Sequence, residues 1–262
     1  MPPGPMHAAG SAKRLGHVGD GVALMGANPI GPGHVPAWRS GGGYARMPLM
    51  NLAPGPASRQ RGALLLADIS GYTGFLQGIT EAHAELKSAD EEPAPVYALL
   101  SGLFDAMASA LGPSFEVVKL EGDAIFAVAP DGAQSVRGTP VIACLRACYA
   151  AFAERLAQGR SQLTCDCNSC SLVERLDLKF VLHHGDYVLH HIVGREELAG
   201  PEVIVAHRLL KNHARDVIGA RPYALLTDAA LEALAVPTAE MAPLTETYEG
   251  LPPIPGHLLV LD

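Results

Sequence analysis

The segment that decides the fold is ALLLADISGYT, residues 63–73. It opens with a short apolar run that ends at Ser70-Gly71, a pattern typical of a buried strand. We expect a helix to begin at about Thr73. Free backbone N–H groups at a helix start can bind phosphate, and Gly71 permits a close approach. The segment therefore predicts that the carboxylate of Asp68 stands beside a place for a phosphate group.

Apolar spacing predicts the other elements of the chain. Helices are expected over residues 95–111, 140–156, 203–212 and 228–234, and strands over 115–119, 124–128, 176–183, 187–193, 223–227 and 257–261. We interpret Gly185-Asp186 as the turn of one hairpin and Glu121-Gly122-Asp123 as the turn of another. This order predicts an α+β fold of the ferredoxin-like kind (βαββαβ), an open sheet covered by helices on one face.

Composition limits the classes of protein that this chain can belong to. Hydrophobic residues make up 48% of the 262 residues and charged residues 18%, so the chain can build a sizeable core. A formal charge of -8 argues against binding nucleic acid or an anionic membrane by general electrostatics. The sequence has neither a bilayer-spanning apolar stretch nor a secretory signal. We therefore expect a cytoplasmic protein.

The first 60 residues differ from the rest of the chain. They are rich in Gly, Pro and small residues and have no sustained apolar period. Ordering such a stretch costs more entropy than its burial returns, so we expect residues 1–60 to be disordered and residues 61–262 to form the domain. Alternatively, the natural start is Met47 or Met50 and the upstream residues are not translated.

Two aspartates form the first candidate site. Asp68 ends an apolar strand, and Asp123 lies in the turn between two others. If these strands pair, both carboxylates emerge at the same edge of the sheet, where they repel each other. An Mg²⁺ or Mn²⁺ ion removes that conflict, because such ions prefer oxygen ligands. The alternative is that Asp68 only caps the helix and Asp123 only makes a turn.

Four motifs resemble those of class III nucleotide cyclases and occur in the same order. They are LADISGYT at 66–73, VKLEGDA at 118–124, LHHG at 182–185 and GPEVIVAHRL at 200–209. Each motif is weak alone, but the ordered set is fairly specific. The chain also resembles a bacterial branch of such domains that carries a cysteine cluster. The resemblance covers roughly residues 62–227 and implies a ferredoxin-like (βαββαβ) nucleotide-cyclase-type sheet with helices packed on it.

The resemblance also implies a two-metal site. By it, Asp68, Asp123 and the carbonyl of Ile69 hold two Mg²⁺ or Mn²⁺ ions, and the helix start Gly71-Tyr72-Thr73 faces the nucleotide phosphates. One ion would lower the pKa of a ribose 3′-hydroxyl for attack on the α-phosphorus of ATP, and the other would steady the leaving pyrophosphate. This chemistry would convert ATP to cyclic AMP.

Three further residues take roles by the same resemblance. Lys119 falls on the position that selects adenine over guanine, and Glu197 on an acidic partner for the adenine amino group. Arg208 falls on the arginine that stabilises negative charge in the transition state. In the family these groups act across a dimer interface from the metal site, so the resemblance implies a homodimer with two composite sites.

The chain departs from the family pattern at two places. Ile204 stands where the family has a transition-state asparagine, and isoleucine offers no hydrogen bond. The tail at 251–257 lacks the lysine that holds the triphosphate in the family. Losing one such donor can cost about a hundredfold to a thousandfold in rate. Lys211, one helical turn beyond Arg208, is a candidate substitute for nucleotide binding.

A cysteine cluster forms a separate candidate site. Cys165, Cys167 and Cys170 can bind one structural Zn²⁺ if a fourth ligand comes from Cys144, Cys148 or a histidine. The alternative is a surface loop of reduced cysteines. Three functions thus remain open: an adenylate cyclase that acts on ATP, a nucleotide- and metal-binding regulatory module with little or no turnover, and a zinc-stabilised scaffold of the same fold.

Overall fold

Strand β1 (Ser58–Ser70) contains the predicted apolar run and lies in the interior of the sheet. In the computed structural model the described residues are 57–82, 95–132, 135–162, 170–192 and 195–262. Residues 1–56, most of the segment that we expect to be disordered, lie outside these ranges. Because β1 begins at Ser58, the sheet starts slightly before the expected domain boundary at residue 61.

The other elements follow the predicted order closely. The helices are α1 (Tyr72–Ala82), α2 (Pro95–Leu111), α3 (Thr139–Gln162), α4 (Pro201–Leu209), α5 (Ala214–Ile218) and α6 (Asp228–Ala233), with a short 3-10 helix η2 (Cys170–Arg175). The remaining strands are β2 (Glu116–Glu121), β3 (Ala124–Pro130), β4 (Asp177–Ile192), β5 (Arg195–Ala199), β6 (Tyr223–Thr227), β7 (Ala242–Glu246) and β8 (Ile254–Val260). None of the helices in the described ranges is long and apolar enough to cross a membrane.

The order of the strands confirms the predicted fold class. The described strands form one sheet in the order β2-β3-β1-β4-β6-β8-β7, with β5 paired to β4. Its first four strands have the ferredoxin-like arrangement, in which β1 lies between β3 and β4 and pairs antiparallel with both. Strand β6 pairs parallel with β4, and β8 and β7 extend the sheet beyond it.

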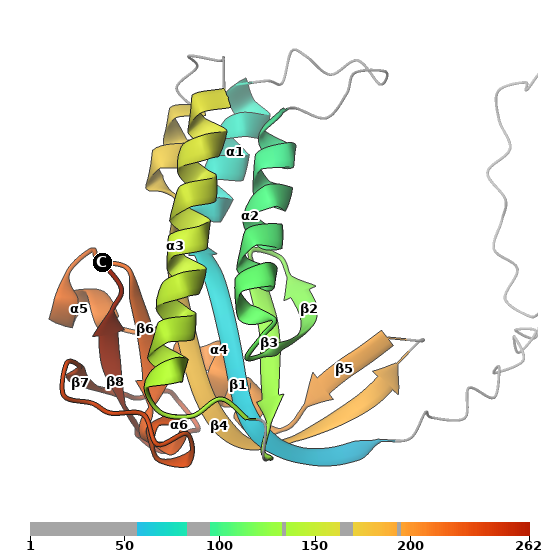
Figure 1. The fold of residues 1–262 in the computed structure, drawn as a ribbon, viewed down its shortest axis with the longest axis vertical. Helices are drawn as coiled ribbons and strands as arrows, with labels where there is room; N and C mark the ends of the chain where they lie inside the picture. Colours follow the sequence, from blue (N-terminus) through green and yellow to red (C-terminus); the bar gives the residue numbers. More distant parts are fainter. Residues whose placement is uncertain (1–56, 83–94, 133–134, 163–169, 193–194) are drawn as a thin grey trace, which may run out of the picture. The chain divides into compact units, whose positions relative to one another are not determined.

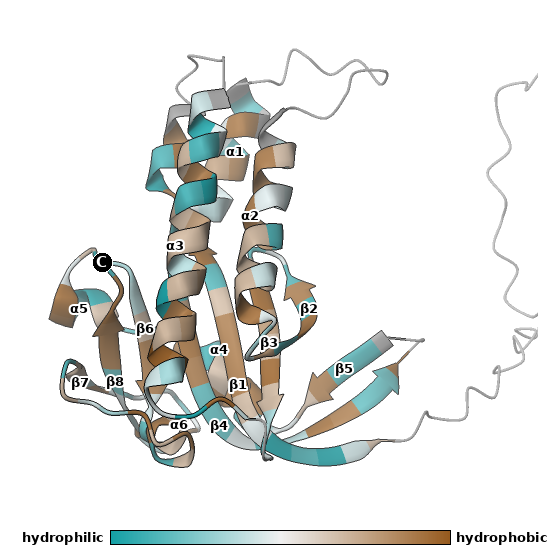
Figure 2. Cartoon of the chain, viewed as in Figure 1, coloured by the Kyte–Doolittle hydropathy of each residue, from teal (hydrophilic) through white to brown (hydrophobic). Residues whose placement is uncertain are grey.

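Alternation along β1 builds a core on each face of the sheet. Leu65 and its odd-numbered neighbours pack under α1, α2, α3 and α6, whereas Leu64 and Leu66 pack under α4 and α5. Figure 1 shows α2 and α3 side by side across the first face, and Figure 2 shows β3 and the adjoining part of β1 in the brown of apolar residues, with the N-terminal end of β1 in teal. The expectation that helices cover only one face is therefore wrong, because Val203 and Leu209 of α4 are buried on the second.

The predicted hairpin around Gly185-Asp186 is also wrong. Strand β4 runs without a turn for 16 residues. Its partner β1 is long enough to pair with it from Ser70 to Ser58, and this pairing keeps Gly185 extended, opposite Gly62. Gly185 instead leaves room for a neighbour, since a Cβ there would lie 2.4 Å from Cγ of Glu202. The chain reverses direction only after β4, and β5 then pairs antiparallel with the end of β4.

We expect Gly62→Ala to lower the free energy of unfolding by about 2 kcal/mol or more. A Cβ at Gly62 would lie 2.4 Å from the carbonyl oxygen of Ala129 and 2.7 Å from Cα of Pro130, so the backbone of β3 would have to move. Urea denaturation measures the change. The matched control is Gly74→Ala on α1, where a Cβ meets nothing within 4 Å. The control should raise stability by about 0.5–1 kcal/mol, and equal effects at the two sites would contradict the argument.

Candidate functional site

The structure brings the two predicted metal-binding aspartates together. Asp68 points to the α4 face of the sheet, and its side chain is 13% exposed. Asp123 lies in the turn between β2 and β3, which Gly122 enables with a φ of +64°. The N–H of Ile69 donates a hydrogen bond to the Asp123 carbonyl oxygen at 2.9 Å. The turn is therefore fastened to the end of β1, next to the carboxylate of Asp68.

The turn between β1 and α1 follows its sequence prediction. Gly71 has a φ of +85°, and a Cβ there would lie 2.8 Å from the carbonyl oxygen of Arg175, so this position requires glycine. Tyr72 is the first residue of α1, and the next residue, Thr73, is exposed. Burial raises the pKa of the Tyr72 hydroxyl, and the charge of Asp123 raises it further. The Tyr72 hydroxyl thus lies within the electrostatic reach of the aspartate pair.

Lys179 on β4 is the counter-ion of Asp68. Its Nζ lies 3.2 Å from Oδ1 of Asp68 and donates a hydrogen bond to the carbonyl oxygen of Leu210 at 3.1 Å. Burial raises the pKa of Asp68, Lys179 lowers it, and Asp123 raises it again, with a net shift above the ordinary value. One lysine therefore does not fully offset the cost of holding a carboxylate in this place.

The aspartate pair fits a divalent cation that binds together with phosphate. No group of three or more His, Cys, Asp or Glu side chains suited to a metal occurs in the described part of the chain. Asp68, Asp123 and the Ile69 carbonyl supply oxygen donors. Mg²⁺ commonly takes one or two carboxylates and completes its shell with water and substrate phosphates. The donors present, and the raised pKa of Asp68, match an Mg²⁺ or Mn²⁺ ion of that kind.

A second polar group on the same face joins Lys119 to Glu197. Nζ of Lys119 lies 2.6 Å from Oε2 of Glu197 and 2.8 Å from Oε1 of Glu121. Glu121 is also 2.6 Å from Nε2 of His207, whose Nδ1 lies 2.7 Å from the carbonyl oxygen of Val203. Both neighbours of the His207 ring accept hydrogen bonds, so both ring nitrogens are placed to donate. The network thus links β2, β5 and α4.

Glu121 should contribute to stability in a pH-dependent way. Burial opposes its charged form, but hydrogen bonds from Lys119 and His207 outweigh burial and lower its pKa below the ordinary 4.5. A lowered pKa means that the contribution is present above the unfolded-state pKa and is lost as pH falls through the folded-state pKa. In metal-free protein at pH 7, we expect Glu121→Gln to lower the free energy of unfolding by about 1 kcal/mol.

Denaturation over a series of falling pH values checks this prediction, because the deficit of Glu121→Gln should shrink as the pH falls through the folded-state pKa. Glu116→Gln is the control, since Glu116 lies exposed on the same strand. A deficit that does not shrink as the pH falls, or that appears equally in the control, would contradict the role of the charge.

The residues predicted for the transition state lie on α4 and just after it. Arg208 is exposed, and the side chain of Ile204 is 56% exposed. Lys211 lies beyond the end of α4, in a turn where its N–H donates to the Arg208 carbonyl oxygen at 3.0 Å. It is exposed there and does not line the pocket around Lys179. Within one chain, these three residues face outward from the second face of the sheet.

The predicted zinc cluster falls largely outside the described residues. Cys165 and Cys167 lie in the undescribed range 163–169, and Cys170 begins η2 but its side chain is not described. Cys144 and Cys148 are buried on α3, and burial raises the pKa of Cys148 to about 12. In the metal-free protein its thiol is therefore protonated, and Sγ donates to the Met107 carbonyl oxygen at 3.7 Å.

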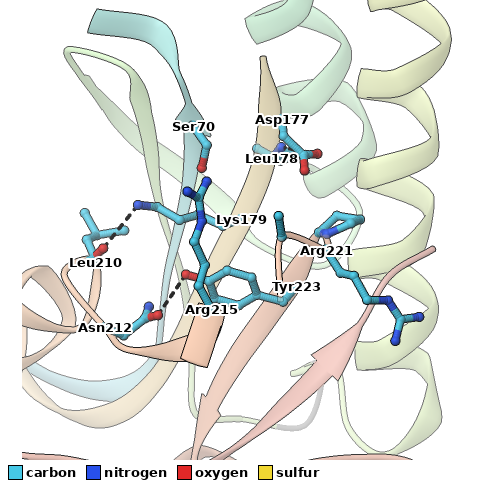
Figure 3. A pocket seen from close by; sticks show the side chains of 11 residues that line it. Ser70, Asp177, Leu178, Lys179, Leu210, Asn212, Arg215, Arg221 and Tyr223 are labelled. Carbon is cyan, nitrogen blue, oxygen red and sulfur yellow. Dashed lines mark hydrogen bonds between the residues drawn. The ribbon is translucent and has the colours of Figure 1, made fainter. Parts of the chain in front are cut away.

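A pocket of about 160 Å³ opens at Lys179, the partner of Asp68, although Asp68 itself does not line it. Its lining includes Ser70, Lys179, Asn212, Arg215 and Tyr223, drawn in Figure 3. Neither Lys179 nor Arg215 was predicted as a site residue. Alternation in β4 places Lys179 on the face of Val181, but only the pairing of Asp68 with Lys179 reveals the contact. That pairing is not encoded in any local sequence pattern.

Comparisons with known proteins agree with this architecture. A family model described as a protein of unknown function (DUF2652) matches residues 100–217. The Mycobacterium tuberculosis protein Rv2561/Rv2562 is 33% identical over 166 residues, which are 62% of this chain and 72% of that protein.

Two solved structures resemble most of this chain. The guanylyl cyclase Cya2 is 16% identical with a TM-score of 0.54, over 78% of this chain and 93% of that chain. The adenylyl cyclase CyaB from P. aeruginosa is 14% identical with a TM-score of 0.55, over 79% of this chain and 96% of that chain. At this level of identity the likeness establishes the fold, which is that of nucleotide cyclase domains.

Proposed function

The chain belongs to the family of the Mycobacterium tuberculosis protein Rv2561/Rv2562, and from its cyclase-type fold we propose that it binds ATP with Mg²⁺ or Mn²⁺ and converts it slowly to cyclic AMP. One observation carries the proposal. Asp68 on β1 and Lys119 on β2 lie on the same face of the sheet, Asp68 beside Asp123 and Lys119 2.6 Å from Glu197. One chain thus carries groups suited to a metal-bound phosphate chain and groups suited to an adenine ring, and a dimer would bring the first set of one copy to the second set of the other.

The metal half of the site would act at the phosphates. Asp68 and Asp123 would hold the divalent ions through carboxylate oxygens, with the Ile69 carbonyl beside them. When bound, these ions supply Lewis acidity to the ribose 3′-hydroxyl and to the leaving pyrophosphate. A bond forms between O3′ and the α-phosphorus, the bond from that phosphorus to the bridging oxygen breaks, and the hydroxyl proton passes to solvent.

The base half of the site would select adenine. Glu197 accepts a hydrogen bond from the exocyclic amino group, and Lys119 donates to a ring nitrogen. Two of the three Lys119 donors already face Glu197 and Glu121, at 2.6 and 2.8 Å. This arrangement fixes the direction of the remaining donor, which favours recognition of one base over another.

A homodimer would complete the site. Arg208 and Ile204 lie on the exposed side of α4, away from the core of their own chain. A second copy that meets this side would present its aspartate pair to Arg208, whose guanidinium would stabilise negative charge at the α-phosphate. Each dimer would then contain two composite sites related by two-fold symmetry.

A regulatory nucleotide-binding module is the second candidate, and Ile204 favours it. An exposed isoleucine at this point of α4 supplies no hydrogen bond to a ribose or a phosphate. Such a protein would hold ATP and metal, and its dimer or a partner would respond to binding rather than to a product.

Two measurements on the full chain separate these functions. Calorimetry with ATP and Mn²⁺ tests binding, and chromatography of the same mixtures tests formation of cyclic AMP. Binding with slow product supports the cyclase, and binding without product supports the regulatory module. Absence of binding would overturn both and leave a scaffold of the same fold.

A further inference from the structure

The pocket beside the Asp68–Lys179 pair is lined by three cations, Lys179, Arg215 and Arg221, and by one carboxylate, that of Asp177. Lys179 and Arg215 both enter it, and Ser70 lies at its rim. Figure 3 shows the guanidinium of Arg215 reaching from α5 toward Ser70, past the stem of Lys179. Two cations and a hydroxyl therefore converge on one small space next to the predicted metal ligand.

Most other polar groups in the pocket are already paired. Oδ1 of Asn212 accepts hydrogen bonds from the Tyr223 hydroxyl at 2.8 Å and the Ala214 N–H at 3.0 Å. Nδ2 of the same residue donates to the Leu209 carbonyl oxygen at 2.7 Å. Arg221 also lines the pocket, but its Nε donates to Asp262 at 3.1 Å, and Figure 3 shows its guanidinium pointing away.

Arg215 differs from Arg221 in this respect. Among the described residues its guanidinium has no hydrogen-bonding partner, and the nearby negative group that acts on it is Asp177. Asp177 is itself occupied, since its Oδ1 accepts a hydrogen bond from the Leu178 N–H at 2.8 Å and its carboxylate also interacts with Tyr149. The five N–H donors of Arg215 are thus available to a ligand.

Lys179 would become available to a ligand when Asp68 binds a divalent cation and no longer pairs with it. In the metal-free protein the ion pair with Asp68 neutralises the ammonium group of Lys179, whose side chain is 20% exposed. A largely buried ammonium group without an anion is costly, and the Leu210 carbonyl oxygen carries no full charge. A phosphate oxygen would replace the lost partner. The two events are linked, because the metal and the phosphate chain arrive together.

We propose that Arg215, with Lys179 and Ser70, forms the subsite for the terminal phosphates of the nucleoside triphosphate. The inference rests on the proposed function and assigns Arg215 a role in binding the substrate. The C-terminal tail offers no lysine for this task, and Arg215 supplies a cation from within the same chain. Its planar fork suits two phosphate oxygens at once.

The test compares Arg215→Gln with Arg221→Gln in the full chain. The probes are ATP and inorganic triphosphate, each titrated by calorimetry in saturating Mn²⁺. We expect Arg215→Gln to weaken both ligands roughly tenfold or more, because a hydrogen-bonded charge pair is lost. Arg215→Lys should fall between this variant and wild type. Arg221→Gln should bind both ligands as wild type does, since its partner is Asp262.

The outcomes separate this inference from the proposed function. If wild type binds ATP and the two glutamine variants behave alike, the subsite is overturned while the proposed function stands. If wild type binds triphosphate in an Arg215-dependent way but not ATP, the pocket holds polyphosphate and the proposed function fails. Binding of neither ligand by wild type would overturn both. Melting temperatures of the variants show that each is folded.

Discussion

Ile204→Asn is expected to raise the rate of cyclic AMP formation roughly a hundredfold, because one preorganised hydrogen-bond donor in a catalytic site is commonly worth that much. Ile204 lies on the exposed side of α4, one helical turn before Arg208. Its side chain is 56% exposed, so asparagine can replace it without opening a cavity in the core. The gain should appear in kcat rather than in KM, since the donor acts on the transition state.

Initial rates with ATP and Mn²⁺ measure the effect. Ile192→Asn is the matched control, because the same substitution there also removes an exposed isoleucine, with 48% exposure, at the end of β4. The control should leave the rate unchanged. If Ile204→Asn binds ATP normally and turns over no faster than the control, then α4 does not approach the reacting phosphate. The regulatory module would become the better description.

Asp68→Asn is expected to weaken binding of ATP with Mn²⁺ more than about a hundredfold. The substitution keeps the shape of the side chain but removes the negative charge that Mg²⁺ or Mn²⁺ needs. It also leaves the largely buried Lys179 without its ion-pair partner. Loss of the charge also removes the burial cost and the repulsion by Asp123 that raise the pKa of Asp68, so we expect the free energy of unfolding to stay the same or to rise.

A double variant separates these two effects. Asp68→Asn combined with Lys179→Met removes both charges, so no unpaired ammonium group is left, and binding of ATP with Mn²⁺ should still be absent. Asp105→Asn is the control, since Asp105 lies exposed on α2. Normal binding by Asp68→Asn, with folding intact, would show that the aspartate pair is no metal site.

Strong local patterns made much of the fold predictable. Helix α2 and strand β6 match their predicted ranges, because each has a clear apolar period between breaks such as Gly112-Pro113. The turn predicted at Gly185-Asp186 failed because its residues favour a turn only locally. The long partner strand β1 holds them extended instead. The expectation that helices cover only one face failed for a similar reason. The apolar stripe of α4 does not indicate which side of the sheet the helix covers.

The candidate site, too, could be predicted only in part. Asp68 could be placed near Asp123 because one lies close to the end of a strand and the other in a short turn, whereas Lys119 and Glu197, which lie within their strands, were linked only by the cyclase resemblance. Contacts of Glu121, Lys179 and Arg215 depend on strand register and on the path of the chain after α4. Sequence reasoning therefore missed the counter-ion of the metal site, although Lys179 lies directly opposite Asp68.

The hydrogen bond between His207 and Glu121 has a consequence for a dimer. It joins α4, which carries Arg208, to the strand that ends two residues before Asp123. In the proposed dimer, one protomer gives its aspartates to one site and its Arg208 to the other. Through this hydrogen bond, a displacement of the aspartate pair in one site would move Arg208 of the same protomer in the other site. The two nucleotides would then bind cooperatively, and the first would set the affinity for the second.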